Sequence, residues 1–242
     1  MSITTDRTVA DIATTSPATI KVFQRHGIDF CCGGKVPLSE VCARKGLDVA
    51  AIVAELQAAE LAPEERESWT DVPLHDLVGY IQERFHQPLR SELPRLSAML
   101  ARVVSRHGDR LPDTLLPLQA TYQELERELL EHMAKEDGVL FPSIVTLEAE
   151  HAQGRPASRD WRWLAQPISV MEAEHATAGA ALERMRAITG SYTPPEDACP
   201  TFRGLYFGLS ELEREMHVHV HLENNVLFPR AARMAEVVVG AK

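Results

Sequence analysis

The residues with the clearest capacity for chemistry stand in a phrase that this 242-residue sequence contains twice. His132 and Glu136 belong to HMAKEDGVLFP, and His219 and Glu223 hold the same places in HVHLENNVLFP. Residues four apart share one face of an α-helix, so each phrase directs an imidazole and a carboxylate to the same side. Both groups are common metal ligands, and their repetition therefore indicates a metal site.

The residues before each phrase predict a helix that turns this face inward. Apolar residues recur at alternating spacings of four and three, which is the pattern of a helix packed in a bundle. The first seam comprises Leu118, Tyr122, Leu125, Leu129, His132, Glu136 and Val139, and the second comprises Leu212, Met216, His219, Glu223 and Val226. Both His–Glu pairs are therefore expected in the interior, at the same depth.

The histidines that flank His219 are not expected to face the interior with it. His217 and His221 are each two residues away, which is about 200° around a helix, so we expect them to face outward or sideways. The alternation of HVHVH at 217–221 makes this the one stretch that could also pass for a strand.

Two further helical segments each place one histidine, His86 or His175, on an apolar seam. Helical periodicity covers four long segments, which are 74–107, 114–150, 160–188 and 200–236. Their connections, at Gly108, 154–158 and 190–197, are short enough to join antiparallel neighbours. The sequence thus predicts an all-α fold in which residues 74–242 form an antiparallel four-helix bundle, built as a duplicated two-helix unit.

Taken one at a time, these residues have an ordinary structural explanation. A single seam histidine is usually a hydrogen-bonded core residue, and a single His-x-x-x-Glu is usually a pair along a helix. Four imidazoles and two carboxylates converging in an apolar interior would leave uncompensated buried charge, which bound cations remove. We therefore predict six metal ligands: His86, His132, Glu136, His175, His219 and Glu223.

The ligand types favour two non-haem iron ions. Four imidazoles are too many nitrogen ligands for magnesium or calcium, and no thiolate is offered to a soft metal. Glu136 and Glu223 can each bridge the two ions, the four histidines cap them, and an oxo or hydroxo group from solvent completes the centre. Manganese or zinc could occupy the same site in vitro.

Two more glutamates are candidates for a supporting part in the site. Glu128 is one helical turn before His132, and Glu174 is next to His175, so either could accept a hydrogen bond from a ligand or line an access path. A solvated face of the bundle is the alternative for both.

Residues 1–60 are predicted to form a separate small helical domain. Helices are expected at 18–26, 37–45 and 49–59, the first begun by Ser16 with Pro17 and the last capped by Asp48. The charged, proline-containing segment 61–73 lacks periodicity and is predicted to be a linker.

The N-terminal region also carries a pair of adjacent thiols. Cys31 and Cys32 precede two glycines, which predicts exposed thiols on a flexible loop. Such a redox-active pair can be nitrosylated, be oxidised to a vicinal disulfide or hold iron transiently, and the sequence leaves these choices open. The alternative is two small buried residues under a tight turn. Cys42 and Cys199 are expected to be inert.

The composition limits the partners and the cellular compartment that we expect for this protein. A net charge of −10 argues against nucleic acid as a partner, because phosphate backbones require clustered lysine and arginine. Four cysteines without a spaced framework or a CxxC pair indicate a reducing, cytoplasmic environment. No apolar run is long enough for a signal peptide or a membrane span, so we expect no membrane association. A homodimer stays open.

The motifs resemble those of the repair of iron centres family, also called the ScdA, YtfE or DnrN type of iron–sulfur cluster repair di-iron protein. The N-terminal region is similar to a ScdA-type domain through GIDFCCGG at 27–34, and the remainder is similar to a hemerythrin-like bundle. The bundle motifs are FHQPLRSELPRL at 85–96, HMAKEDGVLFP at 132–142, PISVMEAEH at 167–175 and HVHLENNVLFPR at 219–230.

The resemblance implies a function and the same six ligands. It implies repair of iron–sulfur clusters damaged by nitric oxide or peroxide, with the di-iron centre as iron donor or redox centre and damaged cluster proteins as partners. Binding or reduction of nitric oxide is the alternative, and reduction is the activity expected if the protein is an enzyme. A sensor of nitric oxide, dioxygen or redox state is a further alternative. Pro88, two residues after His86, could kink the first helix near a ligand.

Overall fold

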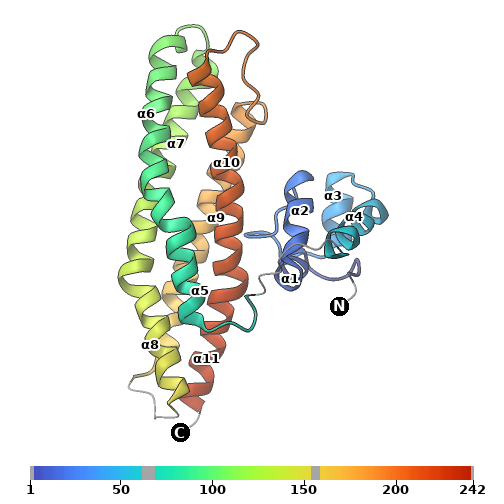
Figure 1. Cartoon of the computed structure of the whole chain (residues 1–242), viewed down its shortest axis with the longest axis vertical. Coiled ribbons are helices and arrows are strands. Elements are labelled where there is room, and N and C mark those ends of the chain that lie inside the picture. Colours follow the sequence, from blue (N-terminus) through green and yellow to red (C-terminus); the bar gives the residue numbers. More distant parts are fainter. Residues whose placement is uncertain (1–2, 62–68, 154–158, 241–242) are drawn as a thin grey trace. The chain divides into compact units, whose positions relative to one another are not determined.

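The computed structural model describes residues 3–61, 69–153 and 159–240, and every regular element within these ranges is a helix. Small N-terminal helices are followed by long helices that form a bundle, which confirms the predicted fold class (Figure 1). The expected linker residues 62–68 and the expected loop 154–158 lie outside the described ranges. Among the helices described, none combines the length and the apolarity that crossing a membrane requires.

The chain divides into two compact units, and neither is a single stretch of sequence. The first contains residues 1–78, 144–165 and 217–242, and the second contains residues 79–143 and 166–216. The boundaries expected from the sequence, at 1–60, 61–73 and 74–242, stay a prediction.

The first unit begins with four short helices. They are α1 (Val9–Thr15), α2 (Ile20–Arg25), α3 (Leu38–Lys45) and α4 (Val49–Leu61). Asp48 caps α4 as predicted, since its carboxylate accepts a hydrogen bond from the N–H of Ala50 at 2.9 Å. Helix α1 was not anticipated, because only seven residues form it and they offer too few turns for a periodic signal.

The expected start of the second helix differs from the structure. Pro17–Thr19 forms a 3₁₀ turn before α2, and the hydroxyl of Ser16 donates to the carboxylate of Glu60 instead of capping the helix. A tertiary partner has thus replaced the local one, which the sequence could not reveal.

The same unit contains the later segments that follow or precede the long helices. These are α5 (Leu74–Ile81), most of α8 (Phe141–Ala152), the turn Trp161–Leu164, the end of α10 and α11 (Phe228–Gly240). Glu148 of α8 accepts hydrogen bonds from the backbone N–H groups of Leu74 and His75, and so caps the start of α5. Trp161 is fully buried and donates to Glu150 at 2.8 Å.

The second unit consists mainly of four long helices that run antiparallel to their neighbours in sequence (Figure 1). They are α6 (Gln87–His107), α7 (Pro112–Lys135), α9 (Ala165–Ile188) and α10 (Pro200–Leu222). Tyr122 of α7 is fully buried and donates its hydroxyl to the carbonyl of Leu93 in α6 at 2.8 Å. HVHVH lies inside α10, so the strand alternative for this stretch is wrong.

Within the described residues, three π-helical turns interrupt the long helices, and each lies at a predicted ligand. They are η2 (Gln82–His86), η3 (Glu136–Leu140) and η5 (Glu223–Leu227). Each is followed after one residue by a proline, at Pro88, Pro142 or Pro229. A proline cannot donate to the carbonyl four residues before it, and the wider turn lets the preceding residue bond five residues back instead.

The π turns correct one seam position. Val139 was expected inside but is 57% exposed, whereas Leu140 is 2% exposed. Because η3 adds a residue to the turn after Glu136, the inward face moves on by one position. The second seam keeps Val226 buried, as expected, with Leu227 buried beside it.

Candidate metal centre

All six predicted ligands are buried, and none is more than 3% exposed. Both glutamates and one histidine lie in π turns, and the other three histidines lie in regular helix. His86 is the last residue of η2, Glu136 and Glu223 are the first residues of η3 and η5, and three histidines belong to regular helix: His132 in α7, His175 in α9 and His219 in α10. Burial of two carboxylates and four imidazoles requires compensation.

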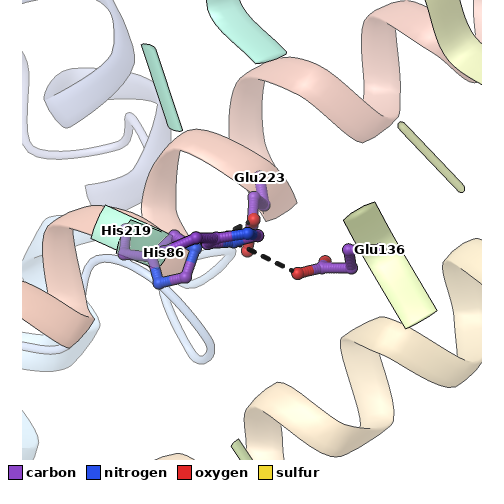
Figure 2. Close-up of side chains that lie close together, drawn as sticks. All are labelled: His86, Glu136, His219 and Glu223. Carbon is purple, nitrogen blue, oxygen red and sulfur yellow. Dashed lines mark hydrogen bonds and ion pairs between the residues drawn. The ribbon is translucent and has the colours of Figure 1, made fainter. Parts of the chain in front are cut away.

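The six residues form two groups of potential metal ligands that share both carboxylates. One group comprises His86, Glu136, His219 and Glu223, and the other comprises His132, Glu136, His175 and Glu223. Within each group, one ligand atom per residue lies within 4.8 Å of the others. Figure 2 shows the first group, with both carboxylates directed toward the imidazole rings. The arrangement is that of a di-metal site with two shared carboxylates.

The interatomic distances fit ligands that bind shared cations. The Nε2 atoms of His132 and His175 are 2.9 Å apart, and Nε2 of His132 is 3.2 Å from Oε2 of Glu136. Two ligand atoms that bind one ion at about 2.1 Å and at right angles are separated by about 3 Å. His219 Nε2 and Glu223 Oε1, at 3.0 Å, have the same spacing.

Glu136 provides the strongest indication that a cation belongs here. Its carboxylate is completely buried, and neither of its oxygens accepts a hydrogen bond from any described residue. A buried carboxylate that lacks donors is strongly unfavourable, whereas bonds to two cations would occupy both oxygens. The donor set therefore fits a pair of metal ions.

Hydrogen bonds from outside the centre orient two of the histidines. Nδ1 of His86 is 2.9 Å from Oδ1 of Asp137, and Nδ1 of His132 is 2.8 Å from Oε2 of Glu174. An ionised carboxylate only accepts, so each Nδ1 carries the hydrogen and each Nε2 keeps a lone pair for a metal.

Both carboxylates remain ionised near neutral pH. Burial acts to raise the pKa of Asp137, but hydrogen bonds and charge from Gln82, His86 and Arg90 outweigh it and lower the pKa. Burial likewise acts to raise the pKa of Glu174, and hydrogen bonds from Lys135 and His132 lower it overall.

The sequence anticipated Glu174 as a hydrogen-bond acceptor but missed Asp137. The available signal was weak, since Asp137 follows Glu136 directly and an asparagine, Asn224, holds the equivalent place in the second phrase.

Glu128 lines a cavity beside the candidate centre, and its role in an access path stays a prediction. With His132, Lys135, Glu174 and His175, it lines this cavity of about 190 Å³. Two of these lining residues are predicted ligands, so a small molecule in the cavity could reach the His132 side of the centre.

The cysteine loop differs from its expected exposed state. Cys31 is buried, 5% exposed, and Cys32 is partly exposed, with 3.7 Å between their sulfur atoms. A hydrogen bond with Cys32 raises the pKa of the Cys31 thiol well above its usual value, and burial and Asp29 act in the same direction. The expectation of two exposed thiols is therefore wrong for Cys31, and a redox role for the pair stays a prediction.

Asp29 holds this loop in a tight turn. Its carboxylate accepts the backbone N–H groups of Cys31, Cys32 and Gly33 at 2.9, 3.0 and 2.7 Å. Burial acts to raise the pKa of Asp29, but these backbone hydrogen bonds lower it overall. A Cβ at Gly34 would lie 2.7 Å from the carbonyl oxygen of Phe30, so the turn requires glycine there.

His221 corrects a second expectation, since it is 1% exposed instead of facing solvent. Its Nδ1 lies 3.2 Å from the carbonyl oxygen of Phe30, and its ring meets the Phe30 ring edge-on at 5.4 Å. Asn225 also donates to the Phe30 carbonyl at 3.2 Å. His221 does point away from the side of α10 that carries His219, but that other side is covered by another part of the same compact unit.

Comparisons with known proteins agree with this geometry. Residues 5–60 match ScdA_N, described as a domain of unknown function (DUF542), and residues 80–166 and 162–231 match the hemerythrin HHE cation binding domain. The chain is 39% identical over 228 residues to an iron-sulfur cluster repair protein YtfE of Yersinia pseudotuberculosis serotype O:1b, covering 94% of this chain and 97% of the relative. A YtfE protein of Yersinia pestis (strain Pestoides F) is 38% identical with the same coverage.

Proposed function

Because this chain belongs to the YtfE family of iron–sulfur cluster repair proteins and carries a hemerythrin HHE domain, we propose that it is a di-iron protein that helps rebuild damaged iron–sulfur clusters. The damage is that caused by nitrosative or oxidative stress. The observation that carries the proposal is the pair of buried His/Glu groups that share Glu136 and Glu223.

The proposal assigns two non-haem iron ions to these groups. His86 and His219 would hold one ion, His132 and His175 the other, with both glutamates shared and an oxo or hydroxo bridge between the ions. A ligand set made only of nitrogen and oxygen donors suits iron, and the bound ions would supply redox chemistry or transferable iron. Asp137 and Glu174 support the assignment because they orient two imidazoles toward the centre.

Repair requires contact with other proteins, so the proposed partners are proteins with damaged iron–sulfur clusters. Nitric oxide or dioxygen are the proposed small ligands. The proposed organisation is an N-terminal domain at 1–60, a linker at 61–73 and a di-iron bundle at 74–242, active in the cytoplasm.

The test is reconstitution of an oxidatively inactivated iron–sulfur enzyme. The iron-loaded protein should restore activity faster and further than the same amount of free ferrous salt. A Glu136→Gln variant, checked for helical content, should give no more than the salt control. If free ferrous salt restores as much enzyme activity as the iron-loaded protein does, the repair function is refuted.

A second candidate, nitric oxide binding or reduction, is favoured by the cavity beside His132 and His175. Its volume of about 190 Å³ accommodates diatomic molecules next to predicted ligands. Anaerobic mixing of the reduced iron-loaded protein with nitric oxide should then yield nitrous oxide, measured by gas chromatography. Uptake of nitric oxide without nitrous oxide would leave binding alone.

A further inference from the structure

A thiol and an imidazole lie together in the second unit, where α6 ends and α10 begins. Sγ of Cys199 is 3.7 Å from Nε2 of His107, and both residues are partly exposed. Neither residue takes part in the candidate metal centre. A nucleophile and a base within hydrogen-bond reach form the arrangement that activates a cysteine, so the Cys199 thiol is a candidate nucleophile.

The two residues line a groove that is rich in cations. The groove has a volume of about 510 Å³, and its walls include Arg102, Arg106, His107 and Cys199. Both arginines are exposed, so their guanidinium groups are available to an anion. The lining of this groove is therefore basic in a protein whose net charge is −10.

The surrounding structure holds the pair in place. Cys199 is the residue before α10, and its carbonyl accepts the N–H of Arg203 at 3.1 Å. The Arg203 guanidinium in turn binds the carbonyls of Glu196 and Ala198, which fixes the backbone leading to Cys199. His107 packs against the ring of Phe202 at 5.5 Å.

The pair lies between two helix ends of opposite polarity. Cys199 is at the start of α10, where the field of the helix favours negative charge, and His107 is in the last turn of α6, where it favours positive charge. Asp197, two residues before Cys199, is bonded to Arg110 at 2.9 Å, so its charge is balanced.

We propose that Cys199 is a site of reversible modification by an anionic low-molecular-weight disulfide, with His107 as the base and Arg102 and Arg106 as the anion-binding residues. His107 takes the thiol proton, and Sγ attacks one sulfur of the disulfide. A mixed disulfide forms at Cys199, the original S–S bond breaks, and the released thiolate takes up the proton. A thiol in excess reverses the reaction.

The experiment uses the full-length, metal-loaded chain with glutathione disulfide as the anionic probe and bis(2-hydroxyethyl) disulfide as the neutral one. Peptide mass spectrometry measures the modification rate at each cysteine, so reactions at Cys31 and Cys32 are counted separately. Cys42 is 1% exposed and serves as the internal control for unfolding, because it should stay unmodified.

Three results are expected. Cys199 reacts faster with glutathione disulfide than with the neutral disulfide, and added salt removes this preference. His107→Gln slows both reactions about tenfold, since the attacking species is the thiolate. The double variant Arg102→Gln/Arg106→Gln slows only the reaction with glutathione disulfide.

The proposal is overturned if Cys199 reacts equally fast without His107, or if loss of the two arginines leaves the preference for the anionic disulfide unchanged. If His107→Gln makes Cys42 reactive, that variant has unfolded, and the test then rests on the double variant Arg102→Gln/Arg106→Gln, which changes only exposed residues. Cys199→Ser should leave iron content and cluster repair unchanged, which separates this site from the proposed function.

Discussion

Asp137→Asn is expected to loosen one of the two metal ions selectively. Asp137 contacts the candidate ligand His86 at 2.9 Å, with its carboxylate 25% exposed. Asparagine fits the π turn, because Asn224 occupies the same place in η5. The substitution therefore removes the charge with little change in shape.

The size of the effect follows from what the carboxylate does. It accepts from His86 Nδ1, from Gln82 at 2.9 Å and from Arg90, and an amide can replace only part of this. Loss of such an outer partner lowers metal affinity about 10- to 100-fold, which is about 1.4 to 2.7 kcal/mol. A loss of affinity near the larger end of that range is expected here, because an amide NH₂ turned toward His86 would disfavour the tautomer that binds metal.

The assay is chelator competition on the protein loaded anaerobically with ferrous iron. One of two ions should leave the variant at a roughly 10- to 100-fold lower chelator concentration than in the unaltered protein. Glu174→Gln, which acts on His132, should weaken the other ion, and the double variant should weaken both.

Glu131→Gln is the matched control, since it removes one charge from α7 next to His132 while its side chain is 58% exposed and pairs with Arg127. If Asp137→Asn holds both ions as firmly as this control, the orienting role of Asp137 is refuted. Simultaneous loss of both ions would refute the assignment of separate partners to the two groups.

The remaining predictions concern the shared carboxylate, the shifted seam and the cysteine turn. Glu136→Gln should reduce metal content from two ions to fewer than one per chain by elemental analysis, because both groups use this carboxylate. Leu140→Ala should lower the free energy of unfolding by about 2 to 5 kcal/mol in urea titration, whereas Val139→Ser should change it by less than about 0.5 kcal/mol. The reverse order would show that the π turn is absent in solution. Asp29→Ala should cost about 2 kcal/mol at neutral pH, because three backbone N–H groups lose their acceptor. The pKa of Asp29 is lowered in the folded state, so this contribution is present above pH 3.8 and is lost as the pH falls through the folded value. A difference between variant and unaltered metal-free protein that persists at low pH would contradict this assignment.

Much of the fold could be predicted because long amphipathic helices carry a repeated signal. The seams through Tyr122 and Met216 repeat over many turns, and their periodicity identified buried positions correctly up to each ligand. Short elements such as α1 lack that repetition, and the capping partner of Ser16 is distant in sequence.

The sequence by itself determined that two His-x-x-x-Glu pairs and two further histidines lie on inward faces of helices, because helical spacing relates residues only a few positions apart. It could not determine which residues oriented His86, that the helix widens after Glu136, or that His221 and Cys31 are covered. Nor did it reveal that Cys199 meets His107. Those outcomes depend on contacts between residues far apart in the chain, and only the tertiary structure brings such residues within a few ångströms of each other.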